Sequence, residues 1–317
     1  MSNTPVSNVL WGVVCLDHYT ASDELLPGCG ILHNAYHLQQ LGAAPHLLTR
    51  LGAADAETVT RFLTAHQIAV LDEGLLAPGK CARIEIAVDA AGAARVFGFT
   101  PGVWADYRLS AVVEETLAAA QHLHVVLTAP VIGEFMRLGA QGRFAGALVS
   151  VDFLALRDFD EGSFAAALRY VDVAFAGWQG EINDPALQRL VDAASAAGTL
   201  AIFTLGERGV LLCERGSPPR LEAVQAVPIS GSTNGCGDAF ISYFLAEYWR
   251  SRDLRQALDQ GKLGGARATT WRYALPDEAY HGLPPDQCAA RARQQSFAPR
   301  NSPLLKSTAA PSSPDNG

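Results

Sequence analysis

Short apolar runs alternate with longer segments of helical periodicity along most of the chain. The apolar runs cover residues 9–15, 46–51, 122–127, 147–153, 171–175, 200–205 and 210–213. Helical patterns lie between them, the first two over residues 34–41 and 57–66. Strands that are apolar almost throughout are typical of a parallel sheet covered on both faces. The pattern therefore predicts an α/β fold with a doubly wound, mostly parallel sheet in three layers.

One segment departs from this alternation. Residues 82–88 alternate between inward and outward side chains with period two, residues 89–92 have turn composition, and residues 95–99 return. This pattern predicts a half-exposed β-hairpin. A hairpin that interrupts a βαβ series indicates a small sheet or lid beside the main layer, although an ordinary antiparallel edge gives the same pattern.

Composition and charge restrict the class of protein. Of the 317 residues, 49% are hydrophobic and 18% charged, so the chain can bury a large core. Its 24 Lys and Arg against 32 Asp and Glu give a net charge of −8, and no basic run could follow a phosphate backbone. No apolar stretch reaches the ~18 residues of a membrane span, and the start lacks a signal-peptide pattern. We expect a cytoplasmic protein that binds neither nucleic acid nor membrane.

The cysteines and the C-terminal segment add two further expectations. The six cysteines are Cys15, Cys29, Cys81, Cys213, Cys236 and Cys288. They form no C-x-x-C pair and have no histidines at ligand spacing, which predicts neither a disulfide framework nor a structural zinc. From Gly282 the chain turns to Pro, Ser, Gln and Ala without hydrophobic period. We therefore expect one domain over residues 1–281 and a flexible tail over 282–317.

The richest candidate chemistry lies in residues 230–240, where a glycine-rich turn precedes a helix that starts at about Asp238. Backbone amides of Gly235, Cys236 and Gly237 at such a helix start can converge on an anion, which the helix dipole also favours. Asp238 would then act as a general base beside a transferring phosphoryl group. A helix-capping carboxylate after a glycine turn gives the same pattern.

Several short elements, taken in order, resemble the ribokinase (PfkB) family of carbohydrate kinases. Residues 232–240 are similar to its D-T-x-G-A-G-D-A-F signature, Gly28-Cys29-Gly30 with Asn34 to its G-G-x-x-x-N element, and residues 204–209 to its T-L-G-x-x-G element. Gly12 and Asp17 at the end of the first strand, Leu41-Gly42-Ala43 and Leu51-Gly52 also fall in the family's order. The resemblance covers about residues 8–275.

This resemblance implies a ribokinase-like fold with a small β-sheet lid that includes about residues 82–99. It further implies ATP and Mg²⁺ as cofactors and a sugar as the acceptor of the phosphoryl group. The implied roles are Asp238 as catalytic base; Gly235, Cys236 and Gly237 as anion hole; Asp17, Gly30 and Asn34 as sugar contacts; and Thr204, Gly206 and Gly209 along ATP. From the residues alone, Asp17 could equally be a strand-end turn residue and Asn34 a helix cap.

The sequence also departs from the family's pattern. Ser232 replaces the first aspartate of the signature, and Cys29 replaces a glycine of the G-G pair. The family's N-x-x-E metal element is incomplete and offers only Glu181. Two interpretations follow: a kinase with an altered sugar site in which Glu181 helps to hold Mg²⁺, or a non-catalytic sugar and nucleotide sensor.

A narrower resemblance concerns the substrate. Residues 95–98 and 102–110, residues 173–176 and residues 265–269 resemble the corresponding segments of fructoselysine 6-kinases. The implied acceptor is a primary hydroxyl of a furanose-like sugar, first a fructosamine such as fructoselysine, with fructose, ribose or a ribonucleoside as alternatives. Glu85 and Asp106 are candidates for its cationic part, although both could be ordinary surface charges. An apolar outer face of the hairpin would also allow a homodimer.

Overall fold

The computed structural model describes residues 7–71 and 74–281. These residues fold around two hydrophobic cores, which are separated by one large sheet. The predicted tail, residues 282–317, lies outside the described residues, so its expected flexibility stays a prediction.

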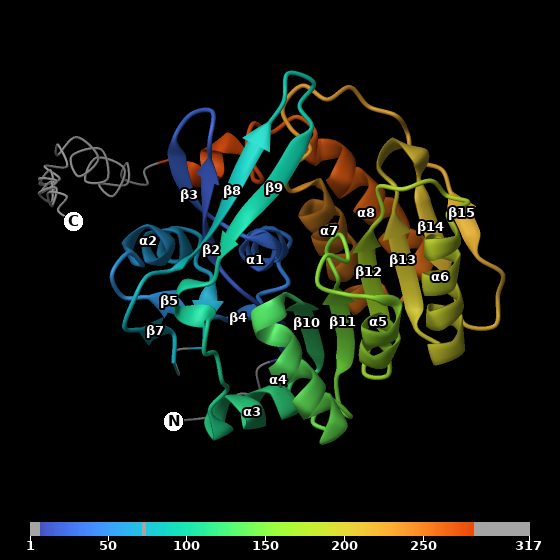
Figure 1. Cartoon of the computed structure of the whole chain (residues 1–317), viewed down its shortest axis with the longest axis horizontal. Coiled ribbons are helices and arrows are strands. Elements are labelled where there is room, and N and C mark those ends of the chain that lie inside the picture. Colours follow the sequence, from blue (N-terminus) through green and yellow to red (C-terminus); the bar gives the residue numbers. More distant parts are fainter. Residues whose placement is uncertain (1–6, 72–73, 282–317) are drawn as a thin grey trace, which may run out of the picture. The chain divides into compact units, whose positions relative to one another are not determined.

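The main sheet confirms the predicted doubly wound arrangement. Its strands are β1 (Asn8–Trp11), β4 (His46–Leu48), β6 (Ala69–Val70), β10 (His122–Val126), β11 (Leu148–Asp152), β12 (Val173–Gly177), β13 (Leu200–Thr204), β14 (Val210–Cys213) and β15 (Arg220–Glu222). Within the described residues their order is β15-β14-β13-β12-β11-β10-β1-β4-β6 (Figure 1). Neighbours from β6 to β13 run parallel, and β14 and β15 pair antiparallel. The sheet is thus mostly parallel.

Helices cover both faces of this sheet. One group consists of α1 (Gly30–Gln40), α2 (Glu57–Ala65), α7 (Cys236–Ser251) and α8 (Leu254–Ala268), and the other of α3 (Ala111–Ala118), α4 (Ala129–Ala140), α5 (Glu161–Leu168) and α6 (Pro185–Ala197). Alternate residues of a strand point to opposite faces. In β13, Ala201 and Phe203 pack with the second group, whereas Ile202 packs with the first. Both faces are therefore buried, which explains the nearly continuous apolar runs.

A separate four-stranded sheet, here called the lid sheet, contains the predicted hairpin. Its strands are β2 (Cys15–Tyr19), β3 (Glu24–Gly28), β8 (Ala82–Val88) and β9 (Ala94–Thr100), in the order β3-β2-β8-β9. The hairpin β8–β9 is as expected, but β2 and β3 were not predicted as lid strands. Asp17 consequently lies within the lid sheet rather than at the end of the first main strand. The chain bends between β1 and β2, which the unbroken apolar run of residues 9–15 could not reveal.

The lid sheet contacts the glycine-rich segment through the turn of its hairpin. Thr233 donates its backbone N–H to the carbonyl of Gly92 at 2.8 Å, and its hydroxyl accepts from the N–H of Ala94 at 2.9 Å. The remaining short elements are β5 (Leu51–Gly52) and β7 (Leu76–Ala77), which pair with each other, and the 3₁₀ turns η1 (Gly102–Trp104), η2 (Gly206–Arg208) and η3 (Asp277–Tyr280). The two hydrogen bonds of Thr233 hold the lid sheet beside the start of α7.

The structure corrects the expectation about cysteines, because Cys15 and Cys29 form a disulfide with Cα atoms 5.3 Å apart. The antiparallel pairing of β2 with β3 sets Cys15 opposite Gly28, which brings the next residue, Cys29, within reach. Spacing along the chain could not show this, since the two residues meet only after the strands pair. Cys81, Cys213 and Cys236 are free thiols.

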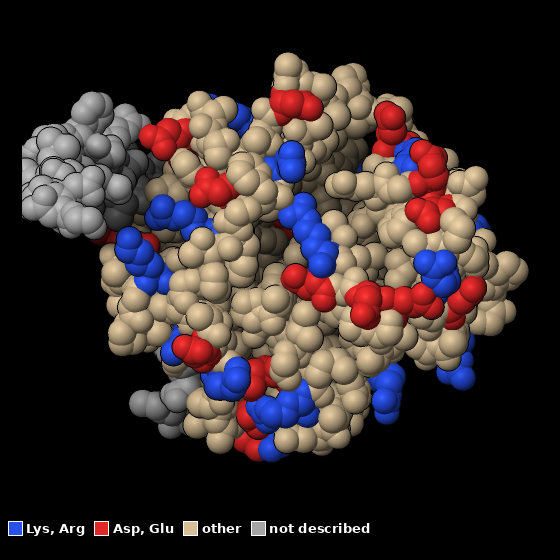
Figure 2. All heavy atoms as spheres, in the orientation of Figure 1, with Lys and Arg blue, Asp and Glu red and all other residues tan. Residues whose placement is uncertain are grey.

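Charged side chains of both signs are visible on one face of the molecule (Figure 2). On the face in Figure 2, basic and acidic side chains are interspersed rather than gathered by sign. Across residues 7–71 and 74–281, no helix is both long enough and apolar enough to span a bilayer.

Candidate active site

The glycine-rich turn places Asp238 in the first turn of α7, where a helix begins at Cys236. Gly235 caps this helix with φ of 78°, and a Cβ there would lie 2.1 Å from the carbonyl oxygen of Ala274. Only glycine fits such a position without strain. The sequence thus folds into the predicted turn because a side chain at residue 235 is excluded both by backbone conformation and by space.

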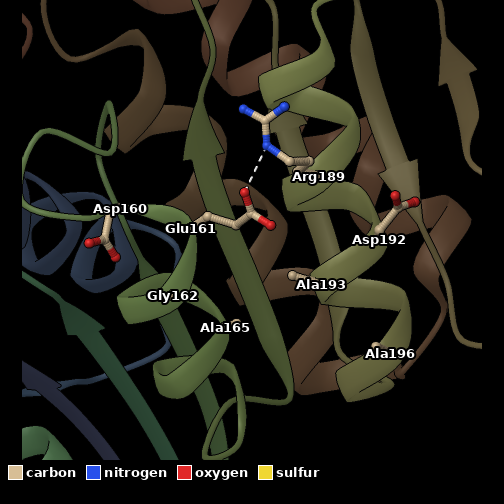
Figure 3. Close-up of a pocket in the computed structure, with 8 residues that line it drawn as sticks. All are labelled: Asp160, Glu161, Gly162, Ala165, Arg189, Asp192, Ala193 and Ala196. Atoms are coloured by element: carbon tan, nitrogen blue, oxygen red, sulfur yellow. Dashed lines mark hydrogen bonds and ion pairs between the residues drawn. The ribbon is translucent and has the colours of Figure 1, made fainter.

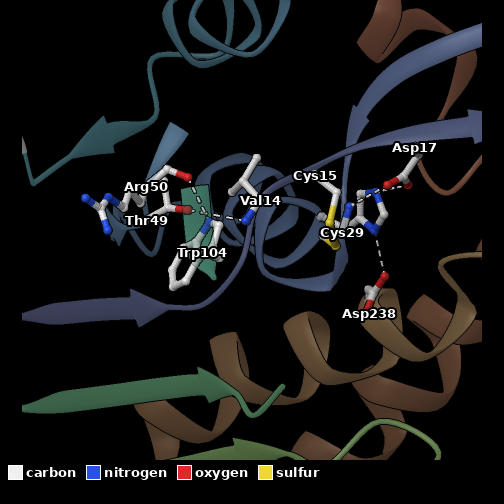
Figure 4. Close-up of a disulfide and its surroundings, with 9 residues drawn as sticks. Val14, Cys15, Asp17, Cys29, Thr49, Arg50, Trp104 and Asp238 are labelled. Atoms are coloured by element: carbon white, nitrogen blue, oxygen red, sulfur yellow. Dashed lines mark hydrogen bonds and ion pairs between the residues drawn. A yellow bond between two sulfur atoms is a disulfide. The ribbon is translucent and has the colours of Figure 1, made fainter. Parts of the chain in front are cut away.

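Side chains from three separate elements, Asp17, His33 and Asp238, meet on what we call the acceptor side. Nδ1 of His33, on α1, lies 2.7 Å from Oδ2 of Asp238, and Nε2 of His33 lies 3.6 Å from Oδ2 of Asp17, on β2. Asp17 and Asp238, both labelled in Figure 4, thus contact different nitrogens of the same imidazole. A Cβ on Gly30 would come within 2.9 Å of Oδ1 of Asp238, so the backbone of α1 passes close to the other carboxylate oxygen.

Burial and mutual charge shift the protonation of this cluster. Burial raises the pKa of Asp17 to about 7, against the lowering effects of His33 and of the N–H of Cys29, which donates to Oδ1 at 3.0 Å. Burial opposes protonation of His33, but its hydrogen bond with Asp238 and the charges of Asp238 and Asp17 outweigh this effect and raise the pKa of His33. The acceptor side therefore favours a charged imidazole between two carboxyl groups.

The structure places Asn34 in a buried hydrogen-bond network, and its role as a sugar contact stays a prediction. Its side chain is fully buried, donates to Nε2 of His124 at 3.1 Å and accepts from the hydroxyl of Ser242 at 2.9 Å. Asn34 therefore ties α1 to β10 and α7. Counting the G-G-x-x-x-N element from Gly28 instead of Cys29 puts His33 in the asparagine position, so this register was the missed signal.

His124 belongs to the same buried network and has no solvent contact. Burial lowers the pKa of His124 to about 3, and its Nδ1 lies 3.0 Å from the hydroxyl of Ser150. It is a packing residue of the interior.

A pocket of about 670 Å³ opens on the other side of the α7 N-terminus and is here called the nucleotide pocket. The residues expected along ATP, Thr204, Gly206 and Gly209, line it together with Cys236 and Gly237 from the expected anion hole. The structure thus joins two sequence elements that lie about thirty residues apart in the chain. A third set of lining residues comes from the segment 224–229 and from α8: Val224, Val227, Ile229, Lys262, Leu263 and Ala266.

This third set, apolar except for Lys262, was not predicted from the sequence, although residues 265–269 resembled a kinase segment. Val227 and Ile229 lie in an extended connection without regular secondary structure. Such a connection has no motif spacing, so nothing along the sequence distinguishes its pocket residues from surface loop residues.

Two departures from the family pattern have structural explanations. Ser232 is fully buried, and its hydroxyl accepts from the N–H of Asn234 at 3.2 Å, so it stabilises the turn. Cys236 is partly buried, and burial together with the charge of Asp238 raises the pKa of its thiol to about 12. Its thiol is therefore protonated at neutral pH and is not poised as a nucleophile.

The expected metal ligand Glu181 lies apart from both the acceptor side and the nucleotide pocket. Its side chain is 83% exposed and lies 3.9 Å from Arg208. The acidic residues that line the nucleotide pocket are Glu207 and Asp259. Mg²⁺ commonly keeps several waters and binds one or two carboxylates plus substrate phosphates, so a pocket with few carboxylates fits a metal carried mainly by the nucleotide.

Two other features of the described residues resemble binding sites. Cys15, Asp17 and Cys29 offer three metal-type ligand atoms within 4.8 Å of one another, but the two sulfurs are bonded to each other. A surface depression between α5 and α6 is bridged by Arg189 and Glu161 at 2.7 Å and contains no residue of the family elements (Figure 3). Neither adds to the candidate active site.

A three-layer α/β domain with a β-sheet lid, and a carboxylate at a helix start between two ligand sides, define the class of ribokinase-like phosphotransferases. The chain belongs to the pfkB family of carbohydrate kinases, whose family model matches residues 34–274. It is thus an ATP-dependent kinase of the sugar and nucleoside kinase type.

Known relatives agree with this membership. The chain is 28% identical over 261 residues to fructoselysine 6-kinase of Escherichia coli (strain K12). The matched region covers 82% of this chain and 96% of that protein. Among solved structures, the acarbose kinase Mak1 superposes with a TM-score of 0.69 at 18% identity and covers 88% of this chain and 99% of its own. Ribokinase from Thermotoga maritima superposes with a TM-score of 0.67 at 16% identity, covering 91% and 99%. The solved structures show the fold.

Proposed function

We propose that this kinase transfers the terminal phosphoryl group of ATP to a primary hydroxyl of a furanose-like sugar, with Asp238 as the base. One observation carries the proposal: Asp238 stands at the N-terminus of α7 between the nucleotide pocket and the polar acceptor side. A base must lie within hydrogen-bond reach of the proton that it removes, and this position provides such reach from both sides.

The chemistry proceeds as an in-line transfer. The acceptor hydroxyl gives its proton to Asp238, its oxygen forms a bond to the terminal phosphorus, and the bond to the bridging oxygen breaks so that the electron pair leaves with ADP. Amides at the start of α7, chiefly that of Gly237, stabilise the transferring group. The N–H of Cys236 already points back to the carbonyl of Thr233 at 3.3 Å, so its share is smaller.

The lid sheet supports this role because Asp17 belongs to it and because its hairpin turn is bonded to Thr233 beside the catalytic helix. A covered site excludes water, which would otherwise accept the phosphoryl group. Mg²⁺ would supply charge neutralisation on the phosphates when bound. Of the chain's residues, Glu207 and Asp259 line the pocket, and Glu181, outside the lining, stays a predicted ligand.

For the acceptor we propose a fructosamine such as fructoselysine. The proposal is supported by the 28% identity to a protein named fructoselysine 6-kinase, which extends over 96% of that protein. Fructose, ribose and ribonucleosides are the alternatives.

Glu85 does not support the recognition of a cationic amino-acid part. It pairs in the lid sheet with His18, and its carboxylate lies 2.5 Å from that ring. Because His18 and Asp17 are successive residues of one strand, they point to opposite faces, and Glu85 shares the face of His18. Asp106 is exposed in the segment after η1. The cationic amino-acid part of a fructosamine must therefore be bound by other residues.

The test is a coupled assay of ADP formation with Mg²⁺ and a panel of fructoselysine, other fructosamines, fructose, ribose and ribonucleosides. Asp238→Asn is expected to lower kcat by about 10²- to 10⁴-fold, because it removes a general base. Nucleotide binding, measured by calorimetry, should persist in the variant. Wild-type protein that binds ATP and sugar but transfers no phosphate would instead favour the sensor interpretation.

A further inference from the structure

The acceptor side contains a buried histidine, His33, with polar contacts and an unpaired ring nitrogen that packing alone does not explain. His33 is 3% exposed and Asp17 is 1% exposed, yet Nε2 of His33 and Oδ2 of Asp17 have no hydrogen-bond partner in the described structure. These two atoms face each other at 3.6 Å. Buried polar atoms are usually paired, so atoms left without a partner need a specific explanation.

The two oxygens of Asp238 are in different surroundings. Oδ2 is engaged by Nδ1 of His33 at 2.7 Å, whereas Oδ1 faces the backbone of Gly30, where a Cβ would stand 2.9 Å away. A side chain at residue 30 would therefore crowd Oδ1. Oδ1 accepts no hydrogen bond from the described residues and the Asp238 side chain is 15% exposed, so Oδ1 is the oxygen left for an acceptor hydroxyl.

We propose that His33 is a positioning residue for the base: a protonated His33, held between Asp17 and Asp238, fixes Oδ2 of Asp238 and thereby presents Oδ1 to the acceptor hydroxyl. The inference rests on the proposed function, since it concerns the same base. A protonated imidazole donates from both nitrogens, so one ring can engage both carboxylates at once.

Electrostatics give this arrangement a second effect. The groups that face the cluster are Asp17 on β2, Asp238 on α7, His37 on α1, and, beyond Asp238, Asp152 on β11 and His124 on β10; Tyr19 and Tyr280 face Asp17. Burial and the charge of Asp238 raise the pKa of Asp152 to about 7. His37 carries no compensating charge, because burial and then the charge of His33 lower its pKa to about 3. His33 is therefore the cation that offsets the negative charge of the carboxylates beside it.

The first experiment compares the pH dependence of kcat/KM for the wild type, His33→Asn and His37→Asn, with the best acceptor from the substrate panel. His33→Asn keeps a polar side chain but loses the charge, so we expect kcat/KM at neutral pH to fall about 10- to 100-fold, as for loss of a hydrogen bond to a charged group. Like charges favour protonation of a carboxylate, so the acidic limb should move to higher pH by about one unit.

His37→Asn is the matched control, because His37 is buried one turn further along α1 and stacks on Trp271 instead of contacting a carboxylate. It is expected to leave the acidic limb in place even if it lowers stability. An active His33→Asn variant with the wild-type pH profile would overturn the inference while leaving the proposed function intact.

The second experiment needs no turnover. The ring protonation of His33 is followed by NMR in the wild type and in Asp238→Asn, without substrate. We expect the ring of the variant to lose its proton at lower pH, because the neutral amide no longer stabilises the cation. Identical titration curves would overturn the inference, whereas failure of the wild type to phosphorylate any sugar would contradict the proposed function separately.

Discussion

The nucleotide pocket and the acceptor side differ in what they present to a ligand. The pocket is formed largely by glycines and apolar side chains, with Gly206, Gly209 and Gly237 beside Val227 and Leu263. The acceptor side is formed by ionisable side chains, Asp17, His33 and Asp238, from three separate elements. One side therefore depends on backbone shape and the other on buried charge.

The departures at Cys29 and at residue 33 fall on the acceptor side, although Ser232 departs within the glycine-rich turn itself. A backbone-built site tolerates few changes, since glycine at a positive φ has no substitute, and its motifs were recognisable. A side-chain site can change its chemistry by one substitution on an unchanged helix, as His33 does on α1. Family membership is therefore visible on the nucleotide side, whereas the acceptor preference proposed above would depend on the acceptor side.

The largest expected effect is a difference in stability between alanine substitutions at two nearby glycines, Gly235 and Gly237. Gly235→Ala places a Cβ 2.1 Å from the carbonyl oxygen of Ala274 at φ of 78°, so we expect a loss of about 4 kcal/mol in unfolding free energy, measured by urea denaturation. Gly237→Ala meets no atom within 4 Å, so stability should be nearly unchanged while KM for ATP rises. Equal stability of the two variants would break the view of a backbone-built site.

A smaller effect is expected from the disulfide on the acceptor side. Cys15 and Cys29 close a loop with a sequence separation of 14, which corresponds to about 3 kcal/mol of stability by the chain-entropy model. Reductant should lower the urea midpoint of the wild type by the corresponding amount. The double variant Cys15→Ser, Cys29→Ser is the control and should not respond to reductant. A wild type that is equally insensitive, with both thiols free by alkylation, would show that the bond does not form.

The smallest effect is expected at Glu181. Because its side chain is 83% exposed and outside the pocket lining, Glu181→Gln should change the Mg²⁺ concentration for half-maximal rate by no more than about twofold. Asp259→Asn, at the pocket lining, is the comparison. A large rise in the Mg²⁺ requirement of Glu181→Gln alone would mean that the loop after β12 turns toward the nucleotide. The nucleotide pocket would then depend on charged side chains, as the acceptor side does.

Much of the fold and part of the site could be predicted from the sequence. The apolar runs predicted the parallel sheet because both of its faces are buried, and period two predicted β8–β9 because one face is half exposed. The turn before α7 was predictable because glycine at residue 235 is required locally. The strands β2 and β3 were missed because a bend between two apolar strands leaves no mark in hydrophobicity.

The sequence by itself determined the three-layer arrangement, the glycine-rich turn and the position of Asp238 at the start of a helix. Each of these depends on residue types within a short stretch of the chain. Tertiary structure alone decided that His33 rather than Asn34 faces Asp238, that Cys15 meets Cys29, and that the segment 224–229 completes the nucleotide pocket. These contacts join elements far apart in the chain. On a helix, a step of one residue turns a side chain by about 100°, so only packing determines which of two neighbours enters a site.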